Sequence, residues 1–373
     1  MTRLIIAIIL LLMALLTVLR APEFHLWMLA IIVSEFCWVF ALIALITFAT
    51  GLTPRLLQLA GSIICVLAFL LYVSPIMRAY IVSDSLKIDI EKAFPADKNI
   101  DDAEPFSLSK LFKSTPHVDH QTLNYATYTD TALTLDFYQS KIKGDRPCVI
   151  VVHGGSWSGG DNKQLPDLNS LLAEKGYHVA AINYRLAPKW KSPAPVEDIA
   201  NCLKHLCHHA AELHLDTAKF ILLGRSAGAQ IALLAAYTLK SKNIVGVIDF
   251  YGPADMVWGY SIPSNPLIMD SRAVMADYVG GTYAQVPEKF KASSPLIFAG
   301  HQVPPTLIIH GENDVLVAYD HSRRLNEKLQ QLGVAHYWLR LPWATHGFDY
   351  VFNGPGGQLS TYAVLHFLNS ITR

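Results

Sequence analysis

A serine framed by small residues lies in the stretch "ILLGRSAGAQIALLA", residues 221–235. Gly224 and Gly228 flank Ser226 in a G-x-S-x-G pattern, which is typical of a sharp turn from a strand into a helix that exposes the serine hydroxyl. On its own the pattern fits a nucleophile and a tight turn equally well. A serine hydroxyl attacks a carbonyl near neutral pH only when a base removes its proton and a carboxylate orients that base. A nucleophilic role for Ser226 therefore requires a histidine and a carboxylate elsewhere in the chain.

A histidine and an aspartate that meet this requirement follow the last two apolar runs of the chain. Asp314 lies in "HGENDVLV" and His346 lies in "ATHGF". Two other carboxylates are near, but Glu312 stands only two residues beyond an expected strand and Asp320 is expected on the following helix. We therefore predict Ser226 as the nucleophile, His346 as the general base and Asp314 as the residue that orients His346.

A glycine-rich loop, "VVHGGSWSGG" at 151–160, supplies candidates for binding an oxyanion. Acyl transfer needs backbone N–H groups aimed at the negative oxygen of its tetrahedral intermediate. We predict that Gly154, Gly155 and Ser156 provide such groups, and that the N–H of Ala227, at the start of the helix after Ser226, adds another. His153 is expected to hold the loop in place. The loop lacks the GxxxxGK[ST] and GxGxxG patterns of phosphate-binding loops.

Eight short apolar runs are expected to be strands, because continuous runs of this length are typical of parallel strands covered on both faces. They lie at 122–128, 133–139, 148–152, 178–182, 219–223, 244–250, 305–310 and 336–341. Helices are expected between them at 163–176, 195–213, 227–241, 318–332 and 359–371. This alternation predicts a doubly wound α/β sheet, on which ligands bind at the carboxyl ends of the strands. Each motif described above follows a strand, so the motifs should meet at one edge of the sheet.

These motifs carry a resemblance to a known family. From about residue 122 to the C-terminus the chain resembles the α/β-hydrolase fold, and it is most similar to the hormone-sensitive-lipase-like carboxylesterases and their relatives. "HGGSW" corresponds to the family's HGGG-type loop, and "NYRLAPKWKSPAPVEDI" at 183–199 corresponds to its YRLAP segment. Two residues depart from the lipase-like pattern: Ser156 replaces a third glycine, and Arg225 stands where Asp is frequent. These departures bring the sequence nearer to feruloyl-esterase-like and kynurenine-formamidase-like enzymes.

The resemblance implies a serine hydrolase that cleaves carboxylic esters through an acyl-enzyme and needs no metal or organic cofactor. Three alternatives stay open: an amidase, formamidase or peptidase on the same scaffold, a prenylcysteine-methylesterase-like enzyme, and a non-catalytic binding module. The segment 255–294 is long for a connection between strands and rich in apolar residues, so we expect a cap that lines a pocket for a hydrophobic ester. Basic and acidic residues number 30 each, which argues against nucleic acid as a partner.

The first 82 residues carry few charges and contain three apolar runs, at 4–19, 26–49 and 56–77. A helix needs roughly 20 apolar residues to cross a bilayer, with about 17 as the short end. We expect residues 1–82 to form about three transmembrane helices, the first of them an uncleaved anchor. The protein would then be a multi-pass membrane protein with the lipid bilayer as its partner.

A carboxylate, Glu35, lies well inside the second of these runs. An ionisable residue within a membrane helix is by default a functional candidate. The alternatives are that Glu35 is neutral, or that it pairs with a neighbouring helix through Ser34 or Thr47. Beyond this region we expect 83–120 to be a linker or to fold over the active site, and 121–373 to be the catalytic domain.

Overall fold

One sheet of eight strands forms the centre of the C-terminal part of the chain. Its order is β1-β2-β4-β3-β5-β6-β7-β8; β2 pairs antiparallel with β1 and with β4, and the other pairs are parallel. The strands are β1 (His120–Tyr128), β2 (Thr131–Tyr138), β3 (Arg146–Val152), β4 (His178–Ile182), β5 (Leu215–Arg225), β6 (Ile244–Phe250), β7 (Thr306–Gly311) and β8 (His336–Leu341). The structure, a computed structural model, describes residues 2–51, 56–95 and 104–373. Each predicted strand overlaps one of these, which confirms the mostly parallel α/β sheet.

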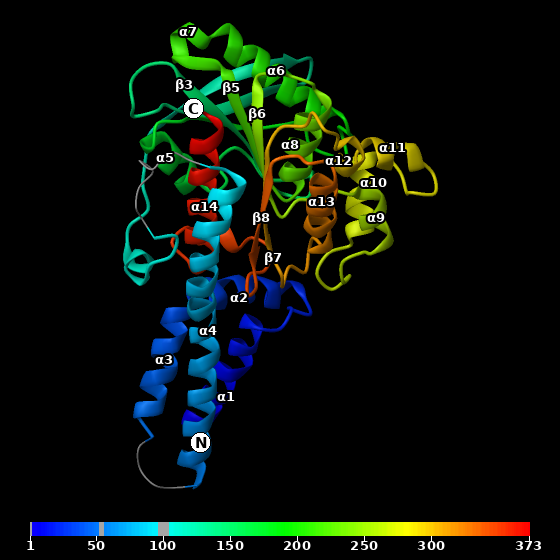
Figure 1. The fold of residues 1–373 in the computed structure, drawn as a ribbon. Coiled ribbons are helices and arrows are strands. Elements are labelled where there is room, and N and C mark those ends of the chain that lie inside the picture. The colour runs from blue at the N-terminus through cyan, green and yellow to red at the C-terminus, as the bar shows by residue number, and fades with distance from the viewer. Residues whose placement is uncertain (1, 52–55, 96–103) are drawn as a thin grey trace.

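Helices cover both faces of this sheet and create two hydrophobic cores (Figure 1). Successive side chains of a strand point to opposite faces. Val149 and Val151 of β3 therefore face one core, whereas Ile150 and Val152 face the other. The first core contains α5 (Pro166–Glu174) and α14 (Pro355–Ile371), and the second contains α6 (Ala194–His208), α7 (Ala210–Leu213), α8 (Ala227–Thr238) and α13 (Asp320–Gln331). This double coverage explains why the strands are apolar throughout.

Short helices form the insertion between β6 and β7. They are α9 (Met256–Ser261), α10 (Ser271–Val279), α11 (Pro287–Ala292) and α12 (Pro295–Phe298). Aspartates cap two of them: Asp255 accepts from the backbone N–H of Trp258 at 3.0 Å, and Asp270 from that of Ala273 at 3.1 Å. Such N-caps satisfy amides that have no partner within the first turn of a helix. The insertion packs beside α13, at one side of the domain (Figure 1).

Three helices form a narrow stalk below the domain (Figure 1). They are α1 (Thr2–Ala14), which η1 (Leu15–Thr17) extends, α3 (Cys37–Ala49) and the first part of α4 (Leu56–Ala93). Alanines let the helices approach closely; those in the stalk core are Ala14, Ala41, Ala44 and Ala68. Arg3 closes the far end of the stalk, where its guanidinium donates to Thr47 O at 2.9 Å, to Gln58 O at 3.0 Å and to Ser62 Oγ at 2.9 Å.

The prediction of a single helix over 26–49 is wrong. The segment forms α2 (Phe24–Glu35) and α3, with an angle of 83° between them. The break follows Glu35, whose carboxylate is buried against the catalytic domain, as described below. A buried carboxyl group needs hydrogen-bond partners. These partners lie on the domain, so α2 stays against the domain while α3 turns into the stalk (Figure 1).

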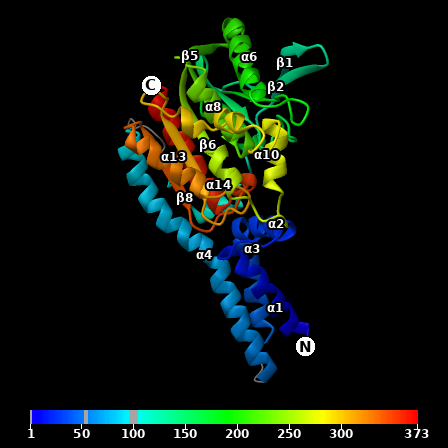
Figure 2. The ribbon, with the colours of Figure 1, turned by 90° about the vertical axis from the view of Figure 1, so that its right-hand side faces the viewer.

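The third apolar run continues further than predicted. Instead of ending at residue 77, α4 extends to Ala93, where Leu86 and Ile90 are buried in the core beside α14. Figure 2 shows α4 leaving the stalk and running up along the domain. The first part of the expected linker is therefore helical, whereas residues 96–103 of that expectation lie outside the described residues. After them, η2 (Leu108–Phe112) packs near α3, with the rings of Phe112 and Trp38 4.6 Å apart.

Among the described helices, one has the length and composition to cross a membrane, namely Gln58–Ala93. The bent pair of α2 and α3 would add a second span only if it formed one segment. A helix of 13 residues such as α1 is about 20 Å long, shorter than the roughly 30 Å of bilayer hydrocarbon. The prediction of about three spanning helices, and with it a multi-pass arrangement, is therefore not supported.

Candidate active site

The strand-to-helix turn at Ser226 has the strained geometry that its sequence predicts. β5 ends at Arg225 and α8 begins at Ala227, so that Ser226 alone makes the turn, with φ 53° and ψ −121°. The flanking glycines are sterically required. A Cβ at Gly228 would overlap the carbonyl oxygens of Val152 and His153. Because Gly228 has no side chain, α8 starts directly against β3. The serine hydroxyl then points outward at the carboxyl ends of the strands.

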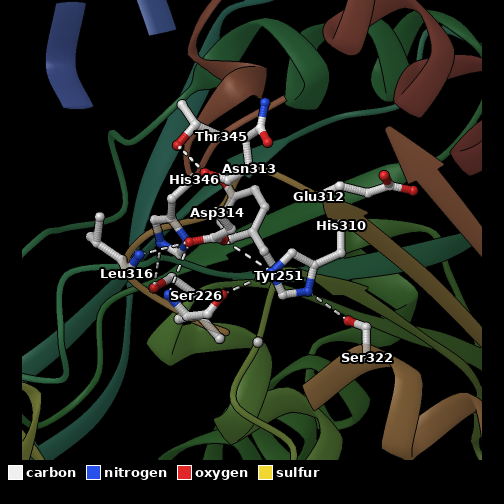
Figure 3. A network of polar contacts seen from close by, with 12 residues as sticks. Ser226, Tyr251, His310, Glu312, Asn313, Asp314, Leu316, Ser322, Thr345 and His346 are labelled. Atoms are coloured by element: carbon white, nitrogen blue, oxygen red, sulfur yellow. Dashed lines mark hydrogen bonds and ion pairs between the residues drawn. The ribbon is translucent and has the colours of Figure 1, made fainter. Parts of the chain in front are cut away.

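The structure brings the three predicted side chains into one relay (Figure 3). Ser226 Oγ lies 2.9 Å from His346 Nε2, and His346 Nδ1 lies 2.7 Å from Asp314 Oδ2. The two competing carboxylates do not reach His346. Glu312 points away from His346 in Figure 3, with Oε1 3.4 Å from the Tyr319 hydroxyl, and Asp320 pairs with Arg323 at 2.6 Å.

Asp314 is held in its ionised form by its surroundings. Its Oδ1 accepts the backbone N–H groups of Leu316 at 2.8 Å and Val317 at 2.9 Å. Its Oδ2 also lies 3.0 Å from Nε2 of His310, a residue that sequence reasoning missed. Burial alone would raise the pKa of Asp314, but the His346 and His310 imidazoles hold this pKa well below its usual range. A carboxylate that stays charged can orient His346 and stabilise its protonated form.

Three of the four predicted oxyanion donors are free to bind. The N–H of Gly154 donates to Gln164 Oε1 at 2.7 Å and is therefore already used. Within the described residues, the N–H groups of Gly155, Ser156 and Ala227 donate to no other group of the protein. Positive φ angles of 123° at Gly155 and 53° at Ser156 fold this loop back beside the nucleophile. The remaining donors are therefore Gly155, Ser156 and Ala227.

An ion pair lies beneath the nucleophile. Arg225 Nε lies 2.5 Å from Asp349 Oδ2, and the Tyr251 hydroxyl donates to Asp349 Oδ1. The ring of Tyr251 lies 4.4 Å from that of His346. Asp349 and Tyr251 were not among the predicted site residues. The only sequence signal for them was the unusual Arg225. A cation next to the nucleophile needs a partner of opposite charge when it is buried.

The N-terminal region contributes to the site directly. Glu35 is 1% exposed, and its carboxylate accepts from Trp343 Nε1 at 3.2 Å and from the backbone N–H of Gly356 at 2.8 Å. Trp27 of α2 donates its indole N–H to the carbonyl oxygen of His346 at 3.0 Å. The predicted intramembrane setting of Glu35 is therefore wrong, and so is the pairing with Ser34 or Thr47. Its burial in the domain raises its pKa to about 8.

A pocket of about 340 Å³ opens beside Ser226. Apolar side chains of the β6–β7 insertion and of the loop after Asp314 form most of its wall. They include Ile262, Ile268, Met269, Val274, Met275 and Leu316. Arg20 and Ala21, which precede α2, lie at the same pocket. Among the residues that the structure describes, no group of three or more His, Cys, Asp or Glu side chains is arranged to hold a metal ion.

Known proteins resemble this chain in sequence and in fold. The profile of the BD-FAE family matches residues 135–329, more than half of the chain. Esterase LipQ of Mycobacterium tuberculosis is 28% identical over 216 residues, covering 54% of this chain and 50% of LipQ. The probable isoprenylcysteine alpha-carbonyl methylesterase ICMEL1 of Arabidopsis thaliana is 28% identical over 221 residues, covering 53% of this chain and 45% of that protein. The chain thus spans about half the length of these relatives.

The fold has close counterparts among solved structures. A bacterial heroin esterase superposes with a TM-score of 0.61 at 22% identity, covering 71% of this chain and 88% of that chain. At this identity the likeness concerns the fold, a mostly parallel sheet with helices on both faces. Because the family profile covers β2 to α13 and the architecture is shared, the chain belongs to the BD-FAE family and has the α/β-hydrolase fold.

Proposed function

We propose that this protein is a membrane-anchored carboxylic ester hydrolase in which Ser226 is the nucleophile, His346 the general base and Asp314 the residue that orients the base. One observation carries the proposal: the unbroken relay from Ser226 Oγ through His346 to Asp314, with separations of 2.9 Å and 2.7 Å. These are hydrogen-bonding distances in the range that proton transfer requires. The relay also ends at the wall of a pocket large enough for a small ester.

The reaction follows from this geometry. His346 Nε2 takes the proton of the Ser226 hydroxyl while Oγ bonds to the ester carbonyl carbon, whose oxygen becomes negative. The N–H groups of Gly155, Ser156 and Ala227 donate to that oxygen. His346 then returns the proton to the departing alcohol, and the C–O bond breaks to leave an acyl-enzyme. Water, deprotonated by His346, attacks the acyl carbon, and the acid leaves as the serine regains its proton.

Hydrophobic esters are the proposed substrates. The wall of the pocket is mostly apolar. Of the charged side chains that line it among the described residues, Asp314 is engaged with His346 and His310, and Arg20 donates to the carbonyl oxygen of Glu312 at 2.9 Å. Burial of apolar surface favours binding by about 25 cal/mol per Å². An acyl or alcohol chain in this pocket would therefore add affinity as it lengthens. The two curated relatives described above, an esterase and a probable methylesterase, support an ester rather than an amide as substrate.

The stalk is the proposed membrane anchor. Its outward-facing side chains are large and apolar, and many are about half exposed; they include Ile9 and Leu12 of α1, Leu45 and Ile46 of α3, and Ile63 and Leu70 of α4. Among the described residues of the stalk, charged groups lie only at its two ends, with Arg3 at the far end, bonded to Ser62, and Arg78 at the domain. Ser62 and Arg78 are 16 residues apart on α4, a rise of about 24 Å, which approaches the thickness of bilayer hydrocarbon. α4 would then cross or enter the bilayer, with α1 and α3 packed on it.

The catalytic proposal is tested with the full chain purified in detergent. A fluorophosphonate probe should label the wild type and leave Ser226→Ala unlabelled, and p-nitrophenyl esters should be turned over by the wild type alone. Catalytic efficiency should rise from acetate to octanoate. Equal labelling of both proteins would remove Ser226 from the mechanism. Turnover of acetate alone would contradict a hydrophobic substrate, and faster cleavage of matched p-nitroanilides would identify an amidase.

The anchor is tested by extracting membranes from cells that express the chain. Alkaline carbonate should leave the wild type in the membrane pellet, because apolar helices hold it there. A variant with Leu67→Arg and Leu70→Arg on the exposed face of α4 should be released, since charged side chains within hydrocarbon cost several kcal/mol. Release of the wild type by carbonate would contradict the anchor. That result would not bear on the catalytic proposal, because the catalytic proposal is tested with the detergent-purified wild type.

A further inference from the structure

The loop between β8 and α14, which carries His346, is held by contacts with α2 of the N-terminal region. Within the catalytic domain this loop is held by the bonds of Asp349 to Arg225 and Tyr251. It is also held where the N–H of Asn313 donates to Ala344 O at 3.0 Å and the Thr345 hydroxyl donates to Asn313 O at 3.2 Å. On its other side the loop meets α2, more than 300 residues away in the sequence. The position of the base therefore depends also on a helix outside the domain that contains the rest of the relay.

Glu35 ties together the two ends of this loop. Its Oε1 accepts from Trp343, three residues before His346, and its Oε2 accepts the N–H of Gly356, ten residues after His346. Gly356 lies in the first turn of α14, where backbone N–H groups have no partner within the helix. The helix boundary residue, Gly354, has no side chain to cap them. A Cβ at Gly354 or Gly356 would press on Glu35, so the two glycines provide the space that the carboxyl group fills.

Trp27 acts on His346 itself. Its indole N–H donates to the carbonyl oxygen of His346 at 3.0 Å, and its ring lies 6.4 Å from the imidazole. A bond to the backbone of His346 leaves both ring nitrogens free for Ser226 and Asp314. It fixes the direction in which the side chain leaves the main chain. One turn further along α2, Ile31 packs at Gly347, the residue after His346.

We infer that α2 contributes to the active site through two positioning residues, Trp27 and Glu35. They hold the His346 loop so that Nε2 faces Ser226. The inference rests on the proposed function and goes beyond it, because it places residues of the N-terminal region in the catalytic geometry. Displacing a catalytic group by about 1 Å can cost on the order of 100-fold in rate. Neither residue contacts the substrate pocket directly, so the loss should fall on kcat rather than on KM.

The test uses the full chain in detergent and three variants of α2. Trp27→Phe keeps an aromatic ring but removes the N–H donor, and Glu35→Leu removes both acceptor oxygens at similar volume. Glu35→Gln keeps one acceptor and serves as the conservative rescue. Trp38→Phe, on α3 against Phe112, is the matched control for a lost indole N–H. Each protein is titrated with the fluorophosphonate probe, so that rates are expressed per competent site.

We expect kcat per titrated site, and the rate of fluorophosphonate acylation, to fall between about 10-fold and 100-fold in Trp27→Phe and in Glu35→Leu. KM should change less than about twofold, Glu35→Gln should recover most of the lost rate, and Trp38→Phe should match the wild type. A merely structural role would lower the titrated fraction and leave the rate per site unchanged, which would overturn the inference. If Glu35→Leu does not fold, Trp27→Phe decides. A wild type that the probe does not label would overturn the proposed function and this inference together, whereas normal labelling without ester turnover would overturn only the choice of substrate.

Discussion

Arg225 and Asp349 form a buried ion pair that joins the nucleophile turn to the loop of the general base. Arg225 immediately precedes Ser226, Asp349 follows His346 by three residues, and the two side chains are 3% and 6% exposed. Asp349 also accepts from Tyr251, whose ring packs on His346. This pair explains why the turn carries arginine where aspartate is frequent in the lipase-like pattern. An aspartate there would face Asp349 and repel it.

Breaking this pair from one side should be costly. Asp349→Asn leaves the Arg225 guanidinium buried without a counter-charge, which typically lowers the free energy of unfolding by about 3–5 kcal/mol. The double variant Arg225→Met, Asp349→Leu removes both charges and should lose less than the single one. Denaturant unfolding in detergent measures both. Asp320→Asn, which breaks the half-exposed pair with Arg323, is the control and should cost less than about 1 kcal/mol. A double variant no more stable than Asp349→Asn would contradict this account.

Asp314→Asn should leave the protein folded and nearly inactive. The amide oxygen of Asn can still accept from Leu316 and Val317, but the amide cannot stabilise a protonated His346. The equivalent change in a serine protease lowers kcat about 10⁴-fold, and we expect a loss of similar order in ester turnover. Glu312→Gln, two residues away, should keep wild-type kcat because Glu312 does not reach His346. The choice of acid is mistaken if the two variants lose activity equally.

Glu35 should make stability fall as pH rises from about 4.5 to 8. Its pKa is about 8 in the folded state, through burial, and near 4.5 when exposed, so that in this range the folded chain holds one proton more than the unfolded chain. The free energy of unfolding then decreases by about 1.4 kcal/mol per pH unit and levels off above pH 8. Glu35→Gln removes this titration. The slope difference between wild type and Glu35→Gln isolates Glu35 from other groups, such as Asp249, whose pKa burial raises to about 7. Parallel stability curves for the two proteins would refute a buried, protonated Glu35.

Gly228→Ala should disable the nucleophile turn. The added Cβ would overlap the backbone of Val152 and His153, which cannot move aside as a flexible side chain could. We expect α8 to shift from β3, with a loss of at least about 1–3 kcal/mol in stability and of fluorophosphonate labelling. At Gly300 the nearest atom to an added Cβ is 4.0 Å away, so Gly300→Ala should be labelled like the wild type. Normal labelling of Gly228→Ala would show that the turn tolerates a wider separation.

Much of the sheet and of the relay could be predicted because each feature is local in the sequence. Parallel strands covered on both faces are continuous apolar runs, and for β4, β6 and β8 the predicted bounds are those observed. The relay residues follow strands whose carboxyl ends meet at one edge, so chain order alone indicated that Ser226, Asp314 and His346 come together. The N–H of Gly154, a predicted oxyanion donor, is occupied by its bond to Gln164, and no local pattern reveals that contact.

The N-terminal region was harder to predict, since its structure depends on contacts over long separations. No proline or glycine lies near residue 36, so the run at 26–49 has the pattern of one helix. The bend follows from Glu35 meeting Trp343 and Gly356 more than 300 residues later. The partner of Arg225 is likewise 124 residues away. A carboxylate in an apolar run is compatible with a membrane or a protein interior, and only the fold distinguishes the two.

The continuity of α4 has a consequence for how the enzyme would meet its substrate. Its 38 residues form one helix about 57 Å long, from the far end of the stalk to the core beside α14. With the stalk in a bilayer as proposed, a continuous helix instead of a flexible linker would connect the domain to the membrane. The pocket would then stay at a constant distance from the membrane surface. The enzyme would then search a plane instead of a volume. Its turnover would follow the number of ester molecules per unit area of that surface, whatever their concentration in the surrounding water.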